Sequence, residues 1–200
     1  MNPVNSFINS IQTFSLNKFL KSVFSDKEVL DKFLTLPASC NNHHQEAGGL
    51  CAHSLEVAKL IGKNEFESKY LRELTMVAGF LHDIGKIKTI SGVGQLSTLG
   101  FQVSHECLNY EICGVALKQL EKDCKMGADF LRHVWSCSSF GAHYGYQPNS
   151  DLALIVKQAD QLSVHRDLQR QAFENSKAFD GIYFHQNRRY QKTNHLPKIF

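Results

Sequence analysis

The sequence has little proline, no low-complexity run and no long apolar segment. Four prolines in 200 residues leave no proline-rich linker that would mark a domain boundary. The longest apolar run, Leu152–Val156, is far shorter than the roughly 20 residues that cross a bilayer. The chain is long enough for one hydrophobic core, so we expect a single domain over residues 1–200 and no association with a membrane.

Paired cysteine motifs are also missing. The six cysteines occupy positions 40, 51, 107, 113, 124 and 137, without a CxxC motif or a regular spacing. The N-terminus lacks the basic start and the continuous apolar segment of a signal peptide. These absences predict a cytoplasmic protein with reduced, mostly buried thiols.

Acidic residues are absent from the last twenty positions. Residues 181–200 carry a charge of +4 and the whole chain +3, so residues 1–180 sum to −1; the basic residues are Arg188, Arg189, Lys192 and Lys198. The body of the protein therefore has no general basic field, and affinity for nucleic acid would require a local patch. We expect a basic tail over 181–200 that either binds phosphates or forms a solvated chain end.

Apolar residues recur at helical spacing along most of the chain, and strand-like alternation is scarce, so the predicted fold class is all-α. Ser25 and Glu28 form a capping-box pattern that predicts a helix start. The Ser91–Phe101 stretch predicts a loop with room for a short strand pair. We expect helices within 4–34 and over 67–84, 128–135 and 151–173, and two more that begin after Gly48-Gly49 and at His105. Gly85 is the expected stop of the helix over 67–84. The helix from His105 is expected to direct Leu108, Ile112 and Val115 inward.

Five polar residues interrupt the apolar faces of these helices: His53, His82, Asp83, His105 and Asp160. One such histidine is more often a hydrogen-bonded core residue than a ligand, and Asp160 alone could pair with Lys157 on the surface. Such residues on the apolar faces of several separate helices favour one metal ion that binds them all, because buried charges need a compensating partner. Imidazoles and carboxylates suit divalent ions of the Mn, Fe, Ni, Zn or Mg range, and one carboxylate can bridge two ions.

The pattern "His53 … His82-Asp83 … Asp160", with "FLHDIGK" around the pair, resembles the HD-domain superfamily of metal-dependent phosphohydrolases over about residues 35–170. Within it, "LPASCNNHHQEAGGLCAHSLEVA" and "KQADQLSVHRDL" look most like the HD region of conjugative relaxases of the MobH class. Related "HH…GGL…H" patterns also occur in bacterial HD-type exoribonucleases. The resemblance implies an HD-domain helical bundle that binds one or two divalent metal ions.

The resemblance also implies roles for individual residues. His53, His82, Asp83 and Asp160 would hold the first ion, and Asp83 would bridge to a second one. His105 and His143 would complete the second site, with His133 as the substitute for His143. Asp83 and Lys86 would be the catalytic residues, and substrate would be contacted by His43, His44, Lys86 and Arg166.

The function expected from this set is hydrolysis of a phosphoester in single-stranded DNA, RNA or a nucleotide by a metal-activated water. The relaxase resemblance adds a link to conjugative DNA transfer. Two alternatives stay open. Some members with the same ligands are di-iron oxygenases, and a metal-stabilised module for binding DNA or a protein would turn nothing over.

Overall fold

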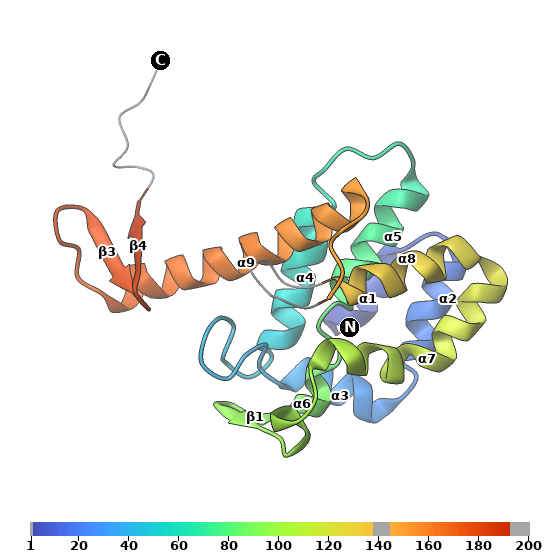
Figure 1. The fold of residues 1–200 in the computed structure, drawn as a ribbon, viewed down its shortest axis with the longest axis horizontal. Coiled ribbons are helices and arrows are strands. Elements are labelled where there is room, and N and C mark those ends of the chain that lie inside the picture. The colour runs from blue at the N-terminus through green and yellow to red at the C-terminus, as the bar shows by residue number, and fades with distance from the viewer. Residues whose placement is uncertain (1, 138–144, 193–200) are drawn as a thin grey trace.

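A computed structural model describes residues 2–137 and 145–192 of the chain (Figure 1). Helices dominate, and the prediction of an all-α fold is confirmed, with two small antiparallel strand pairs, β1–β2 and β3–β4, as additions. The elements are α1 (Pro3–Ser10), α2 (Phe14–Val23), α3 (Lys27–Thr35), α4 (Gly49–Ile61), α5 (Lys69–Phe80), α6 (Lys86–Thr89), β1 (Ile90–Gly92), β2 (Gln95–Leu96), the 3-10 helix η1 (Leu99–Phe101), α7 (His105–Asp123), α8 (Lys125–Ser136), α9 (Asp151–Asn175), β3 (Ile182–His185) and β4 (Arg188–Gln191).

The N-terminal helices share the main hydrophobic core with the region expected to form the domain's centre. Phe7 of α1 stacks on Phe80 of α5 with ring centroids 4.1 Å apart, and Phe33 of α3 meets the same ring edge-on at 5.3 Å. Aromatic pairs of this geometry add to the stabilisation from burial itself. They fix the end of α5, which immediately precedes His82 and Asp83 in the chain.

Around this core, α4 packs against α5 and α9, and α7 packs against α2 and α8. The indole of Trp135 on α8 is buried and donates a hydrogen bond to the carbonyl of Ala78 on α5, at 3.2 Å. Ser68 and Ser150 begin α5 and α9 by accepting hydrogen bonds from the N–H groups of Leu71 and Ala153. The helices that carry the candidate ligands are therefore anchored at defined positions.

Three details of the sequence-based prediction are wrong. The predicted helix over 67–84 ends at Phe80, so His82 and Asp83 lie in a turn. Asp26, rather than Ser25, caps α3, because its carboxylate accepts from the N–H groups of Glu28 and Val29. Val115, expected to face inward on α7, is 83% exposed.

The C-terminal part differs from the expected basic tail. Helix α9 continues to Asn175, and its second half extends beyond the helical body (Figure 1). It is followed by the β3–β4 hairpin, whose Tyr190 is buried against Leu168 and Ala172 of α9 in a second, smaller apolar cluster. Among the described helices, none is both long and apolar enough to cross a membrane. All six cysteines are free thiols.

Candidate metal centre

Four side-chain atoms from three segments converge on one point. His53 comes from the middle of α4, His82 and Asp83 from the turn after α5, and Asp160 from α9. The Nε2 atom of His53 lies 3.4 Å from Nε2 of His82 and 3.1 Å from Oδ1 of Asp160, and the latter two atoms are 3.4 Å apart. Asp83 adds its Oδ2, at 3.6 Å from His53 and 3.3 Å from His82.

The protonation of the two imidazoles follows from their other ring nitrogens. Nδ1 of His82 lies 2.7 Å from the carbonyl oxygen of Gly79, which can only accept, so this nitrogen carries the hydrogen. Nδ1 of His53 lies 3.0 Å from the Ser163 hydroxyl, whose single hydrogen is donated to Glu56, so His53 donates here too. Both Nε2 atoms are then lone-pair acceptors aimed at each other and at two carboxylates.

This arrangement fits a divalent cation. Four acceptors without a donor among them repel one another unless a positive charge lies between them. Ligands about 2.1 Å from one ion, in tetrahedral or octahedral geometry, lie about 3.0–3.4 Å from each other, which is close to the separations found here. Within the described residues, one group has candidate ligand atoms that all lie within 4.8 Å of one another, and it consists of His53, His82 and Asp160.

Without an ion, a proton takes over part of this compensation. Burial alone would lower the pKa of His82, but Asp83 and Asp160 together raise it to about 10. Burial dominates at His53 and lowers its pKa, although a protonated ring would gain a hydrogen bond to Asp160. Burial opposes ionisation of Asp83 as well, yet His82 and Lys86 hold the pKa of its carboxyl well below the usual range. The site is therefore anionic enough to retain a cation.

The second oxygen of Asp83 faces another histidine. Oδ1 lies 3.0 Å from Nε2 of His105, the first residue of α7, while Lys86 places its Nζ 2.6 Å from Oδ2. A carboxylate oriented in this way has one oxygen in the four-atom cluster and one toward His105. A carboxylate with its two oxygens directed to different groups can bridge two ions, and this role of Asp83 stays a prediction.

The turn that carries His82 and Asp83 is held by Asn109, which is fully buried on α7. Its amide donates to the carbonyl of His82 at 2.6 Å and accepts from the N–H of Gly85 at 2.7 Å. Gly85 is required for this approach, since a Cβ there would lie 1.9 Å from the carbonyl oxygen of His105. Asn109 and Gly85 therefore fix Asp83 and His105 relative to each other.

Replacing Asn109 by alanine is expected to lower the free energy of unfolding by about 2–4 kcal/mol, because two buried backbone groups lose their partners. Urea denaturation would measure this. Asn64→Ala is the matched control, since Asn64 also makes two side-chain hydrogen bonds to the backbone but is exposed. Equal losses for the two variants would contradict the role given to Asn109.

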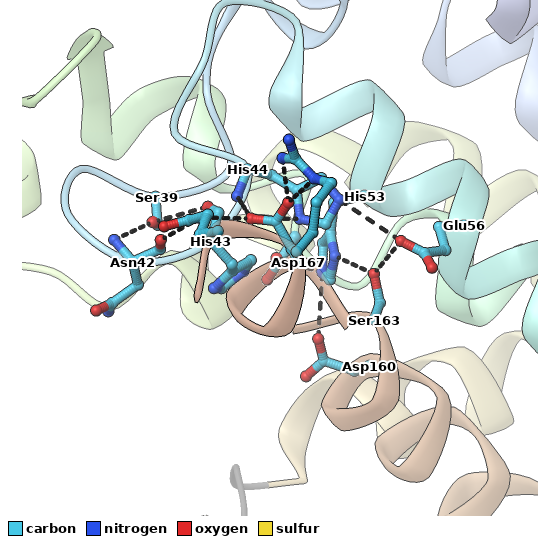
Figure 2. Close-up of polar contacts among 12 residues, drawn as sticks. Ser39, Asn42, His43, His44, His53, Glu56, Asp160, Ser163 and Asp167 are labelled. Carbon is cyan, nitrogen blue, oxygen red and sulfur yellow. Dashed lines mark hydrogen bonds and ion pairs between the residues drawn. The ribbon is translucent and has the colours of Figure 1, made fainter. Parts of the chain in front are cut away.

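His53 is positioned by a chain of polar contacts (Figure 2). Ser163 of α9 accepts from His53 and donates to Oε2 of Glu56 at 2.9 Å. The buried His44 places its Nε2 3.5 Å from the same oxygen, and Arg166 lies 3.7 Å from Oε1. Partners of this kind orient a ligating imidazole and tune its basicity. Sequence reasoning missed Glu56 and Ser163, although Ser163 follows Asp160 by three residues on the same helix face.

Replacing Ser163 by alanine is expected to weaken metal binding about tenfold, because His53 loses the acceptor that sets its tautomer. Titration with Mn²⁺, followed by calorimetry, would measure the change. Ser136→Ala serves as the control, since the Ser136 hydroxyl donates to the carbonyl of His133 on its own helix and does not contact the described His53–His82–Asp160 cluster. An unchanged affinity for Ser163→Ala would show that His53 needs no such support.

The loop that contains His43 and His44 is held against α9. The backbone N–H of His44 donates to Asp167 at 2.7 Å, which stabilises the left-handed φ of 44° at His44. Gln171 donates to the carbonyl of Asn42. Gly49 allows the close approach of this loop, because a Cβ there would lie 2.0 Å from the carbonyl oxygen of His44. The second glycine of the Gly48-Gly49 pair therefore lets the loop of His43 and His44 pack against the start of α4.

A cavity of about 720 Å³ opens in front of the four-atom cluster. It is lined by His43, Asp83, Lys86, His105, Lys157, Gln158, Asp160, Gln161, Leu162, Val164, His165 and Arg188. Burial lowers the pKa of His43 to about 3, assisted by nearby Lys86 and His53, so this imidazole is neutral at pH 7. Lys157, considered from the sequence only as a surface partner of Asp160, lies instead on the cavity wall and forms no described ion pair with Asp160. His165 was not identified from the sequence, because residues that flank a pocket on one helix face carry no periodic signal.

Other residues proposed for the site lie elsewhere. Arg166 reaches Glu56 on a different face of α9 and is not part of the described cavity lining, and His44 is buried behind His53. His133 accepts from the backbone N–H of Asn149 at 3.1 Å and does not line the cavity either. His143, the preferred late histidine, lies outside the described residues.

Comparison with known proteins identifies a family and several relatives of this chain. The HD domain profile matches residues 50–164. The 3'-5' exoribonuclease YhaM of Oceanobacillus iheyensis is 35% identical over 99 residues, which are 48% of this chain and 31% of the relative. The same-named protein of Shouchella clausii is 29% identical over 127 residues, 62% of this chain and 39% of the relative.

The chain thus spans between about a third and two fifths of the length of these relatives. No solved structure was found to match it. The expected closeness to conjugative relaxases gains no support from the relatives, which are named as exoribonucleases. The matched residues 50–164 make up more than half of the chain and include His53, His82, Asp83 and Asp160, so the protein belongs to the HD domain family.

Proposed function

We propose that this protein is a divalent-metal-dependent phosphodiesterase that hydrolyses single-stranded RNA. The observation that carries the proposal is the convergence of four acceptor atoms at the base of a cavity whose other charged lining residues are all cationic: Lys86, Lys157 and Arg188. Such a cavity favours a substrate that brings negative charge to a metal ion. The exoribonucleases among its relatives support RNA as the polymer.

We propose His53, His82, Asp83 and Asp160 as ligands of a first ion, and Asp83 with His105 as part of a second site. Divalent ions bound there would supply Lewis acidity for the attacking water and for the phosphoryl oxygens. Lys86 lies on the cavity wall beside Asp83, where its ammonium can neutralise charge that develops on a phosphoryl oxygen. His43, neutral at the cavity edge, can contact the substrate or hold a water molecule.

Elemental analysis of the protein as purified, followed by a hydrolysis screen, tests the proposal. The screen offers 5'-labelled single-stranded RNA, the DNA of the same sequence and a small phosphodiester, each with Mn, Ni, Fe, Mg or Zn. We expect bound divalent metal and shortening of the RNA. Metal-loaded protein that cleaves none of the three substrates with any ion would refute the proposal.

The same assays separate the alternatives. A di-iron oxygenase would contain two irons and change its optical spectrum with O₂, and a binding module would bind RNA or DNA without cleaving it. A link to conjugative transfer remains a prediction from the resemblance alone and would require cleavage of single-stranded DNA. A cytoplasmic location remains part of the proposal, consistent with the six free thiols.

A further inference from the structure

The β3–β4 hairpin lies outside the part of the chain that matches the family, yet it reaches the cavity. Arg188, the first residue of β4, lines the same cavity as Asp83, Lys86 and His105. The family match ends at residue 164, so Arg188 lies outside the matched region. Twenty-eight positions separate Arg188 from Asp160, and the turn back from α9 brings the two to one cavity.

The hairpin is fixed against both the helix and the histidine loop. Tyr190 is 3% exposed, and its ring centroid lies 5.4 Å from that of His165 on α9. His185 contacts the amide of Gln171 at 3.1 Å, and the same amide group bonds to the carbonyl of Asn42. Gln186, in the hairpin turn, donates to the carbonyl of Asn41 at 3.2 Å. Arg188 is therefore presented by an anchored strand.

Strand geometry separates the neighbouring arginines. Successive side chains of a strand point to opposite faces, so Arg188 shares the face of the buried Tyr190, and Arg189 points the other way. Accordingly, Arg188 lines the cavity and Arg189 is not part of its described lining. Lys192, the third cation of the expected tail, lies 5.2 Å from the ring centres of Phe173 and Tyr183. The three described basic residues of this segment thus have three different environments, and Lys198 lies outside the described residues.

The charges in the cavity divide into two groups. Its described carboxylates, Asp83 and Asp160, belong to the four-atom cluster, where Lys86 pairs with Asp83. Lys157 is only 9% exposed, and within the described residues no carboxylate lies within ion-pair distance of Lys157 or Arg188. Two cations that line one cavity without an acidic partner are available to an anionic ligand. A cavity of about 720 Å³ is in the size range that holds a whole ligand rather than one phosphate group.

We propose that Arg188 and Lys157 form a second phosphate subsite, which binds the backbone phosphate next to the one at the four-atom cluster in single-stranded RNA. This inference rests on the proposed function and extends it. The subsite makes the enzyme prefer a polynucleotide over a diester with a single phosphate, because only a polynucleotide places a second negative charge against the hairpin. Arginine suits this contact, since its planar guanidinium can bind two phosphate oxygens at once.

The test compares Arg188→Ala with Arg189→Ala, two changes of equal chemistry on adjacent, exposed positions of one strand. The substrates are a labelled 12-nucleotide RNA and bis(p-nitrophenyl) phosphate, which has one phosphate. For Arg188→Ala, we expect KM for the RNA to rise about tenfold more than KM for the small diester, and the salt slope of RNA binding to fall by about one. Arg189→Ala should behave as the wild type with both substrates.

Equal effects of the two variants on the RNA would overturn the subsite, as would an equal loss by Arg188→Ala on both substrates. Failure of the proposed function has a different signature, because the wild type would then hydrolyse neither substrate. In that case, the subsite is tested by RNA binding alone, measured by fluorescence anisotropy with the same RNA in the presence of Mn²⁺. Weaker binding by Arg188→Ala than by Arg189→Ala would uphold the subsite, and equal binding would refute it.

Discussion

Replacing Asp83 by asparagine is expected to reduce RNA hydrolysis about a thousandfold and to release the bound metal. The carboxylate is shared by four groups: Oδ2 faces His53, His82 and Lys86, and Oδ1 faces His105. Asparagine keeps the shape of the side chain and removes its negative charge. It therefore removes the proposed anionic ligand, which would also bridge two ions.

Initial rates with labelled RNA and elemental analysis after dialysis measure the two effects. Asp151→Asn is the control, because Asp151 is an exposed carboxylate in the first turn of α9. Circular dichroism should show the same helix content for both variants. Full metal occupancy together with wild-type rates in Asp83→Asn would remove Asp83 from the site.

Gly85→Ala is expected to lower the free energy of unfolding by about 3 kcal/mol and to abolish most of the activity. A Cβ at this position would lie 1.9 Å from the carbonyl oxygen and 2.8 Å from the carbonyl carbon of His105, and backbone cannot move aside as a flexible side chain would. The turn must separate from the start of α7, which breaks the contact between Asp83 and His105. The effect therefore reaches both stability and the metal site.

Gly114→Ala is the matched control, because a Cβ at Gly114 meets nothing within 4 Å and the residue lies within helix α7. Alanine is favoured over glycine in a helix by about 1 kcal/mol, so this variant should melt at the same or a higher temperature. Differential scanning calorimetry compares the two proteins. A Gly85→Ala variant as stable as Gly114→Ala would mean that the turn adapts to a side chain.

The helical body could be predicted from the sequence because its helices bury one continuous face. Leu50, Val57 and Leu60 on α4 are all buried, and His53 lies among them as their spacing required. The same rule failed after Phe80, because Leu81, Ile84 and Ile87 are also buried and extend the apolar pattern through a turn. Burial alone cannot distinguish a helix from a turn wrapped by other helices.

The β3–β4 hairpin could not be predicted for a related reason. Only Tyr190 of its strands is fully buried, so no alternating pattern marks the strands. Gln186 and Asn187 adopt positive φ angles of 47° and 61° in the turn without a glycine, which is the usual signal. Arg188 was therefore recognised as a cation near the chain end, but its place in the cavity depends on tertiary contacts.

The supporting residues were hidden because their effect is indirect. Asn109 and Glu56 bind backbone or other side chains rather than the candidate ion, and neither belongs to a spaced motif. The ligand candidates stood out because imidazoles and carboxylates are unusual on apolar faces. An asparagine or a glutamate within a helix is an ordinary residue in the sequence until its burial and its partners are known.

Helix α9 gives the chain an uneven tolerance to length changes during evolution. Three of its residues serve the site at spacings of three and four positions. Asp160 belongs to the four-atom cluster, Ser163 bonds to Glu56, and Asp167 binds the loop of His43 and His44. One inserted or deleted residue between them would rotate the rest of the helix by about 100° and misplace the downstream contacts together. The β1–β2 hairpin makes no described hydrogen bond or ion pair with these site residues, so lineages of this protein should vary in length there and remain constant across 160–167.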